Sequence, residues 1–278
     1  MNIKRRYFHN LIALLAVLLL ISANIMLMLT MQLLDQTTNA LRSPETNTPE
    51  PTPTDALPYD NSNGIAGFAQ AHNLTLSDWP DSLVALLDKN PEAADFVLNY
   101  PLLKDSEPEI DLGEYLSCNE VPLFLQWDAR WGYSEYGNEL MGLSGCGPTC
   151  LSMVCFYLLK DPQFTPRYVA DFAQQHGYCL PGNGSSWTLI SEGGKMLGLD
   201  VIEIPLDKNR IAGNLEAGNP IICVMGPGDF TTTGHFIVMT DYVDGKIKIN
   251  DPNSPIRSSK LWDYDLIKDQ IRNLWVCC

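Results

Sequence analysis

The sequence is poor in basic residues and in histidine. Only 18 of its 278 residues are Lys or Arg and four are His, against 33 Asp and Glu, which gives a formal net charge of −15. Binding to nucleic acid or to an anionic membrane surface requires clustered Lys and Arg, so this composition excludes a general binder of either kind. Apolar residues make up 45% of the chain, which suffices for a packed core and excludes a disordered tail. A chain of this length holds one or two domains.

The sequence also lacks the spacings that hold metal ions. No Cys-x-x-Cys pair occurs among its eight cysteines, no His and Cys spacing matches a zinc site, and the acidic residues form no calcium-loop pattern. We therefore expect no metal and no other cofactor. A dense disulfide framework is also not expected, because Cys146, Cys150 and Cys155 fall close together in one predicted helix. Several cysteines should instead be buried small apolar residues.

The negative charge is unevenly distributed along the chain. Residues 1–42 carry 4 basic and 1 acidic residue, residues 43–120 carry 2 and 15, and residues 121–278 carry 12 and 17. The acidity therefore belongs mainly to the middle of the chain, and the carboxyl-terminal part is only mildly acidic.

One long apolar run lies near the amino terminus. Residues 11–34 contain no charged side chain. A helix formed by this segment would be long enough to cross the roughly 30 Å hydrocarbon core of a membrane. Basic residues at positions 4–6 precede the run and Asp35 follows it, so the positive-inside rule places residues 1–10 in the cytoplasm and the remainder outside the cell. We expect a single-pass signal-anchor in the cell membrane. The alternative is a cleaved signal peptide with Ile21-Ser22-Ala23 at its cleavage site, which would make the protein secreted.

Two further segments precede the carboxyl-terminal part. Residues 35–63 are rich in Pro and Thr and should form an extended spacer. Residues 64–117 are acidic and show helical periodicity, with a predicted helix start at Ser77-Asp78-Trp79-Pro80 and a second cap at Asn90. We expect two short helices there.

The remaining segment, residues 118–278, has the pattern of an α+β domain. Helices are predicted first, at residues 148–159, 165–176 and 187–197, the last weakened by two adjacent glycines. Strands are predicted afterwards, at residues 201–204, 221–225, 235–243 and 246–250. Helices followed by a sequential set of strands indicate an α+β fold.

A glycine-rich turn places one cysteine at a helix start. Residues 143–149 read LSGCGPT, in which Gly145 and Gly147 flank Cys146 and Pro148 is favourable in the first turn of the next helix. The positive end of a helix dipole favours a thiolate, and the first backbone N–H groups of a helix can receive an oxyanion. Cys146 is therefore a candidate nucleophile, although a buried Cys beside a glycine turn would have the same local sequence.

A thiolate nucleophile needs a base, and His235 is the best placed of the four histidines. It begins the most apolar predicted strand directly after a flexible loop, where an imidazole can face a cleft. Asn250 and Asp251, at the end of the next strand, both offer an acceptor to orient the ring. Side chains alternate along a strand, so Asp251 shares the apolar face that should meet the core and His235, and we choose it.

Two other segments are candidates for the border of a site. Gln126, within LQWD, could donate its side-chain amide to an oxyanion, although a Gln in such a loop is usually a polar surface residue. The loop at residues 182–187 is a candidate cleft wall, and equally a plain turn into a helix.

Four short segments together resemble a known family. The sequence is similar to the stand-alone, exported relatives of the double-glycine (bacteriocin-leader) cysteine peptidases, within the papain-like superfamily, at residues 121–132 (VPLFLQWDARWG), 145–149 (GCGPT), 234–236 (GHF) and 250–252 (NDP). The resemblance covers about residues 120–278. It implies a papain-like α+β fold with Cys146 as nucleophile, His235 as general base and acid, Asp251 as its orienting group and Gln126 as oxyanion donor.

The resemblance implies a hydrolase that cleaves peptide bonds. With the anchor facing outward, its expected substrates are extracellular peptides or cell-wall peptide, and the latter would make it a peptidoglycan amidase or endopeptidase. A wall- or peptide-binding module that keeps the fold without turnover is an alternative, as is a structural surface protein in which the cysteines merely pack a helix.

Overall fold

The computed structural model describes residues 61–278, which belong to one compact unit. The predicted membrane helix at residues 11–34, the basic end before it and the spacer as far as residue 60 lie outside these residues. Within residues 61–278, no helix is long and apolar enough to cross a membrane.

The amino-terminal part of the unit contains three α-helices, where the sequence predicts two. They are α2 (Asn61–His72), α3 (Asp81–Lys89) and α4 (Ala94–Leu103), with 3-10 turns at Leu76–Asp78 and Pro91–Ala93. Pro80 caps α3 rather than forming its first residue, because its ψ of 144° is extended while its carbonyl accepts the N–H of Leu83. Asn90 is a cap as predicted, since its side chain accepts the N–H of Glu92 at 3.2 Å.

A mostly helical layer follows. Its elements are a 3-10 turn (Gly113–Ser117), the hairpin β1 (Glu135–Tyr136) and β2 (Glu139–Leu140), α5 (Met141–Ser144), α6 (Cys146–Leu159), α7 (Pro166–Gln175), a π-helical turn (Leu189–Gly193) and α8 (Gly194–Met196). Central to this layer is α6, in which every residue from 147 to 156 is buried. It begins two residues before the predicted start, because the N–H of Thr149 already bonds the carbonyl of Gly145.

The helix predicted at residues 187–197 is broken into the π-helical turn and α8. Gly194 begins α8 where a Cβ atom would lie 2.9 Å from the Val201 side chain. The paired glycines thus allow the backbone at the start of α8 to lie close to the first strand of the sheet, and they also weaken the regular α-helix there.

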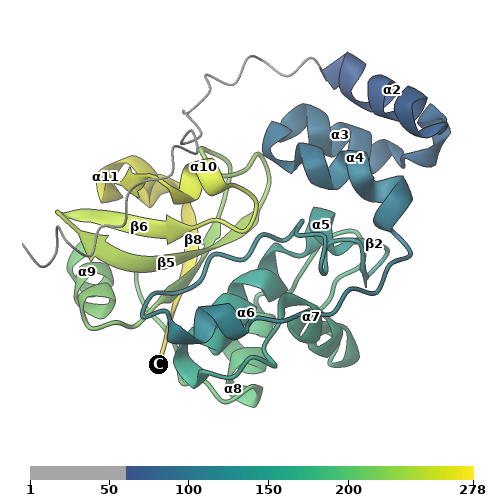
Figure 1. Cartoon of the computed structure of the whole chain (residues 1–278). Helices are drawn as coiled ribbons and strands as arrows, with labels where there is room; N and C mark the ends of the chain where they lie inside the picture. The colour runs from purple at the N-terminus through teal and green to yellow at the C-terminus, as the bar shows by residue number, and fades with distance from the viewer. Residues whose placement is uncertain (1–60) are drawn as a thin grey trace, which may run out of the picture. The chain divides into compact units, whose positions relative to one another are not determined.

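The second layer is a six-stranded antiparallel sheet in the order β3-β8-β4-β5-β6-β7, of which β5, β6 and β8 are labelled in Figure 1. Its strands are β3 (Val201–Glu203), β4 (Ile221–Met225), β5 (His235–Val243), β6 (Lys246–Asn250), β7 (Leu261–Trp262) and β8 (Ile271–Cys277). The four predicted strands are present, and the α+β class with an antiparallel sheet is confirmed. The strands β7 and β8 were not expected, and β8 is inserted between β3 and β4.

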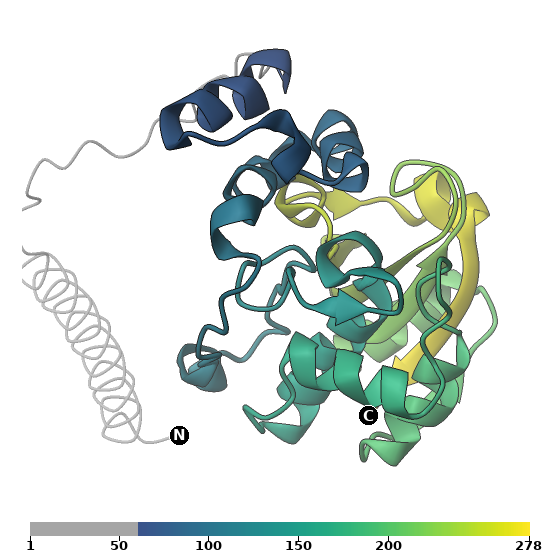
Figure 2. The same cartoon turned by 90° about the vertical axis from the view of Figure 1, so that its right-hand side faces the viewer.

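The two faces of the sheet are covered by different helices. On one face, Phe236 and Val238 of β5 join the cluster of buried residues that contains α6 and α7. On the other face, Ile237 and Met239 pack with Ile211 of α9 (Lys208–Glu216). The short helices α10 (Pro255–Ser258) and α11 (Tyr264–Ile267), with a 3-10 turn at Lys268–Gln270, connect the last strands. In Figures 1 and 2, α2, α3 and α4 lie together at one end of the unit, and Figure 1 shows α8 at the opposite end.

Candidate active site

Cys146 is the first residue of α6, and the two glycines beside it are required by close contacts. A Cβ atom on Gly145 would lie 2.6 Å from the carbonyl oxygen of Met141. A Cβ atom on Gly147 would lie 2.6 Å from Ser185 Oγ, and the Phe236 ring is also nearby, at 3.5 Å. The Gly-Cys-Gly sequence is thus explained by the tight packing of the helix start between α5, the 182–187 loop and β5.

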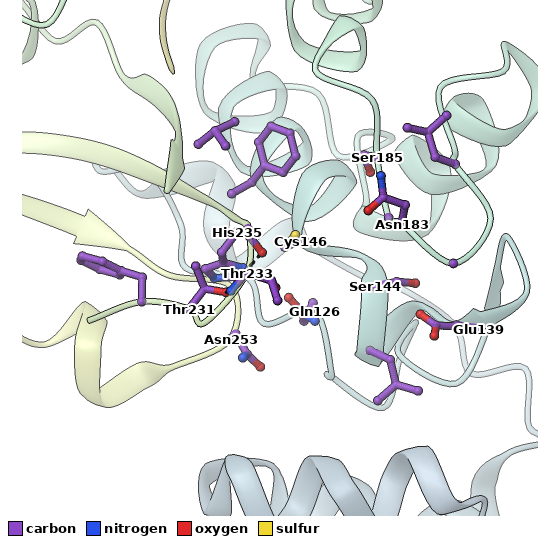
Figure 3. Close-up of a pocket in the computed structure, with 18 of the residues that line it drawn as sticks. Gln126, Glu139, Ser144, Cys146, Asn183, Ser185, Thr231, Thr233, His235 and Asn253 are labelled. Atoms are coloured by element: carbon purple, nitrogen blue, oxygen red, sulfur yellow. Dashed lines mark hydrogen bonds between the residues drawn. The ribbon is translucent and has the colours of Figure 1, made fainter. Parts of the chain in front are cut away.

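His235 and Asp251 form a buried pair beside this cysteine. The distance from His235 Nε2 to Asp251 Oδ1 is 2.7 Å, and the exposed fractions of the two residues are 7% and 0%. Because Nε2 is engaged by the carboxylate, Nδ1 is the ring nitrogen left for the hydrogen bond between His235 and the Cys146 thiol. Figure 3 shows the Cys146 and His235 side chains next to each other.

Electrostatics favours the ionised forms of all three residues over the neutral forms that burial would impose. Burial raises the pKa of Cys146, but the hydrogen bond and charge of His235, with the N–H groups of Phe236 and Gly147, outweigh it and lower that pKa below its ordinary value. Burial likewise opposes the imidazolium, yet Asp251 and then Cys146 raise the pKa of His235 from 6.5 to about 10. The pKa of Asp251 is lowered despite burial, by His235 and Arg257. The site therefore favours a thiolate, an imidazolium and a carboxylate in contact.

Both oxygens of the Asp251 carboxylate accept hydrogen bonds from residues that follow it in the chain. Its Oδ1 also accepts the N–H of Asn253 at 2.8 Å, and its Oδ2 accepts from Arg257 Nε at 2.5 Å. Its backbone N–H donates to Ser258 Oγ at 2.9 Å. Sequence reasoning missed Arg257, because a Ser-Pro step at residues 254–255 indicates a helix start but not the direction in which a later side chain turns.

Asn250, the other candidate orienting group, lies elsewhere. Its Nδ2 donates to the carbonyl oxygens of Val121 and Pro122, at 2.9 and 3.1 Å. The alternation of side chains along β6 thus turns Asp251 toward His235, while Asn250 fastens the segment that leads to Gln126.

Gln126 is buried at the border of the same cavity, with an exposed fraction of 3%. Its N–H donates to the carbonyl of Pro252 at 2.7 Å, and its Nε2 donates to the carbonyl of Gly142 at 2.9 Å. Its Oε1 has no hydrogen-bond partner among residues 61–278. Because Nε2 carries two hydrogens, one N–H remains for a group in the cavity. The structure therefore brings all four predicted site residues together.

Cys146, His235 and Gln126 line a cleft of about 890 Å³, while Asp251 is buried behind His235. The loop at residues 182–187 forms part of its wall, so the candidate wall is present. Opposite this loop lie residues 230–236, and Lys89 of α3 also borders the cleft. Apart from Leu143, Leu180, Trp187, Val224, Phe230 and Phe236, the lining is largely polar or glycine. Within residues 61–278, no group of three or more His, Cys, Asp or Glu side chains could hold a metal ion.

The fold and the site define an α+β protein in which a Cys, a His and an Asp meet at the start of a central helix. The model of the Peptidase C39-like family matches residues 118–277, and the chain belongs to this family. This confirms the resemblance to the double-glycine peptidases stated from the sequence motifs. No curated protein matches the chain.

Two solved structures are similar to this chain. One is the peptidase domain of Streptococcus ComA, a bi-functional ABC transporter involved in quorum sensing, with 18% identity, a TM-score of 0.37 and coverage of 48% of this chain and 89% of that one. The other is described as a C39-like peptidase from Bacillus anthracis, with 14% identity, a TM-score of 0.40 and coverage of 62% and 98%.

Proposed function

We propose that this protein is a cysteine peptidase that hydrolyses peptide bonds with Cys146, His235 and Asp251. The observation that carries the proposal is the connected array of thiol, imidazole and buried carboxylate at the floor of an open cleft, with the pKa of Cys146 lowered and that of His235 raised. A lowered thiol pKa in contact with a positively charged histidine is the usual means by which proteins activate a cysteine nucleophile. Family membership supports the same chemistry.

The proposed reaction has two stages. The Cys146 thiolate attacks the amide carbonyl carbon, and His235 gives its Nδ1 proton to the leaving amine as the C–N bond breaks. This leaves a thioester on Cys146 and a neutral imidazole. His235 then takes a proton from water, whose oxygen attacks the thioester. The carboxylic product is released, and the thiolate and imidazolium are restored.

The negative charge that develops on the carbonyl oxygen needs donors. We assign them to the second Nε2 hydrogen of Gln126 and to the backbone N–H of Cys146 at the start of α6. The bond from Gln126 to the Gly142 carbonyl fixes the amide before substrate arrives. Such preorganised donors stabilise a transition state because they need no rearrangement when the charge forms.

We infer the location of the protein and its class of substrate from residues 11–34, which lie outside the described part of the chain. With residues 11–34 as an uncleaved anchor, the cleft faces the cell exterior, where its substrates are extracellular peptides or cell-wall peptide. The mostly polar cleft lining is compatible with an extended peptide backbone, which offers one donor and one acceptor per residue.

The test is a screen of the full chain against a library of peptides and muropeptides. We expect hydrolysis by the parent, and its loss in Cys146→Ala and His235→Ala with folding retained. His176→Ala is the control, because His176 is exposed at the end of α7 and its ring contacts only the tilted ring of Phe172 and, further away, that of Tyr178 among the ring contacts of residues 61–278. Equal loss in all three variants would refute the assignment of Cys146 and His235, and binding of a library member by the parent without any hydrolysis would favour the non-catalytic binding module. Hydrolysis confined to muropeptides would identify the peptidoglycan endopeptidase.

A further inference from the structure

The amino-terminal helices contact the segment that follows the catalytic carboxylate, although they lie outside the part of the chain that matches the family. That match begins at residue 118, whereas α3, the 3-10 turn at Pro91–Ala93 and α4 end by Leu103. The contacts therefore join the matched part of the chain to residues that precede it, and the residues that make them are Asn90 and Glu92.

Glu92 binds the segment between Asp251 and Arg257 with both carboxylate oxygens. Ser254 Oγ donates to its Oε1, and the N–H of Ile256 donates to its Oε2 at 2.8 Å. Ser254 is itself the N-cap of α10, because its Oγ accepts the N–H of Arg257 at 3.0 Å. One side chain of the helical region thus holds the start of the short helix that carries Arg257.

Asn90 binds the same segment one step closer to the carboxylate. Its Nδ2 donates to the carbonyl oxygen of Asn253 at 2.8 Å and to Asn253 Oδ1 at 3.1 Å. Asn90 is buried, with an exposed fraction of 9%, and its own Oδ1 accepts the N–H of Glu92. The two side chains are therefore held together as one contact surface.

The held segment supplies two of the donors that bind Asp251. The N–H of Asn253 donates to Oδ1, the oxygen that also contacts His235, and Arg257 donates to Oδ2. A displacement of residues 253–257 would therefore move both donors at once, although neither Asn90 nor Glu92 touches the catalytic residues.

The same helices also abut the support of Gln126. The Phe96 ring fills a notch at Gly142, where a Cβ atom would lie 2.5 Å from it. The carbonyl of Gly142 accepts from Gln126 Nε2. Phe96 also stacks on Tyr133 with ring centroids 4.4 Å apart, which closes the notch on its other side. The helical region thus contacts the supports of both the carboxylate and the oxyanion donor.

We propose that Glu92 and Asn90 are positioning residues, through which the amino-terminal helical region holds residues 253–257 so that Asp251 stays aligned with His235. This inference depends on the proposed function only because both concern Cys146, His235 and Asp251. It gives the acidic helical region a role in the reaction that its net charge does not suggest.

Without the contacts of Glu92 and Asn90 to residues 253–257, the ion pair between Asp251 and His235 should be weaker. The ionisable partners of His235 are Cys146 and Asp251, and Arg257 is the further charged partner of Asp251. A carboxylate that is free to move stabilises the imidazolium less, which lowers the pKa of His235 and raises that of Cys146. The thiolate should then form only at higher pH.

The experiment measures the rate at which iodoacetamide alkylates Cys146 in the full chain between acid and alkaline pH. We expect Glu92→Ala to raise the midpoint of the acid limb by about one unit, which is about a tenfold slower alkylation below that midpoint. Asn90→Ala should shift it in the same direction, and Glu92→Gln, which keeps one acceptor, should shift it less. Glu107→Ala is the matched control, because it removes a carboxylate from an exposed position after α4.

The outcomes separate this inference from the proposed function, because alkylation requires no peptide substrate. A shifted profile in Glu92→Ala with no hydrolysis by the parent would uphold the positioning role and reject the peptidase. An unchanged profile in folded Glu92→Ala, or an equal shift in Glu107→Ala, overturns the positioning role. If Glu92→Ala does not fold, Glu92→Gln is judged by the same two criteria. In the peptidase assay, a positioning role lowers kcat with little change in KM.

Discussion

The charge state of Cys146 should depend on Asp251, and Asp251→Asn tests this dependence directly. The substitution keeps the size of the side chain and removes its charge. In the parent, Asp251 is the first cause that raises the pKa of His235, which reaches about 10 although burial lowers it. After burial, the charge and the hydrogen bond of Asp251 are the largest influences on this pKa, so the loss of Asp251 should lower the His235 pKa and weaken the preference for the imidazolium. The pH range over which the ring carries a proton should then end at a lower pH than in the parent.

A less stable imidazolium should raise the pKa of the Cys146 thiol, because the hydrogen bond and the charge of His235 lower that pKa in the parent. Only a few per cent of a free thiol is ionised at neutral pH, so alkylation of Cys146 should slow by about tenfold or more. The assay is the iodoacetamide rate across pH, in which the acid limb should move upward. Asn250→Ala is the control, because Asn250 is buried next to Asp251 and bonds the carbonyls of Val121 and Pro122. It should lower the free energy of unfolding and leave the alkylation profile in place. A parent-like profile in Asp251→Asn would refute the assignment of Asp251.

Three further outcomes are expected. Phe96→Ala removes a side chain of 4% exposure, so denaturant titration should show a loss of about 3–5 kcal/mol in the free energy of unfolding, and a loss below about 1 kcal/mol would contradict the packing described. Gly147→Ala should abolish peptide hydrolysis, because its Cβ would meet Ser185 Oγ at 2.6 Å, and adding Ser185→Gly should restore part of the rate; no restoration would point to another cause. Trp187→Ala should raise KM in the hydrolysis assay, because Trp187 is 47% exposed on the cleft wall, and an unchanged KM would place the substrate elsewhere. The same variant should lower the free energy of unfolding by about 1–2 kcal/mol, because the Trp187 ring packs edge-on against Trp275.

Local patterns predicted the elements that carry the site. The helix start at Cys146 follows from a Gly-Cys-Gly-Pro sequence, and the strand at residues 235–243 from a nearly continuous apolar run, so both depend on adjacent residues alone. The strand β8 was missed although Leu274, Trp275 and Val276 are buried, because Arg272 and Asn273 interrupt the apolar pattern near its start. Its position between β3 and β4 follows from tertiary pairing, which local periodicity does not encode.

In the candidate site, too, the features that depend on neighbouring residues were predicted, and those that depend on residues far apart in the sequence were not. Side-chain alternation along one strand sufficed to prefer Asp251 over Asn250, and the structure turns Asp251 toward His235. No local pattern indicates that Glu92 contacts Ile256, since 164 positions separate them. Contacts of this kind depend on how separately formed elements dock, and a single sequence carries no signal for them.

The segment that matches the family therefore begins later in the chain than the residues that support the candidate site. A fragment that begins at residue 118 would contain Cys146, His235 and Asp251, but it would lose Asn90 and Glu92 and leave the notch at Gly142 without Phe96. The contacts of half-buried Asn253 and buried Ser254 would be exposed to water, and the loss of a buried ring alone costs about 3–5 kcal/mol. Because whole domains are stable by only about 5–15 kcal/mol, a fragment of this kind should be both less stable and less well aligned at Asp251. The catalytic unit that should be produced and assayed consequently begins no later than α3, and the acidic helical region belongs to the proposed enzyme rather than to its spacer.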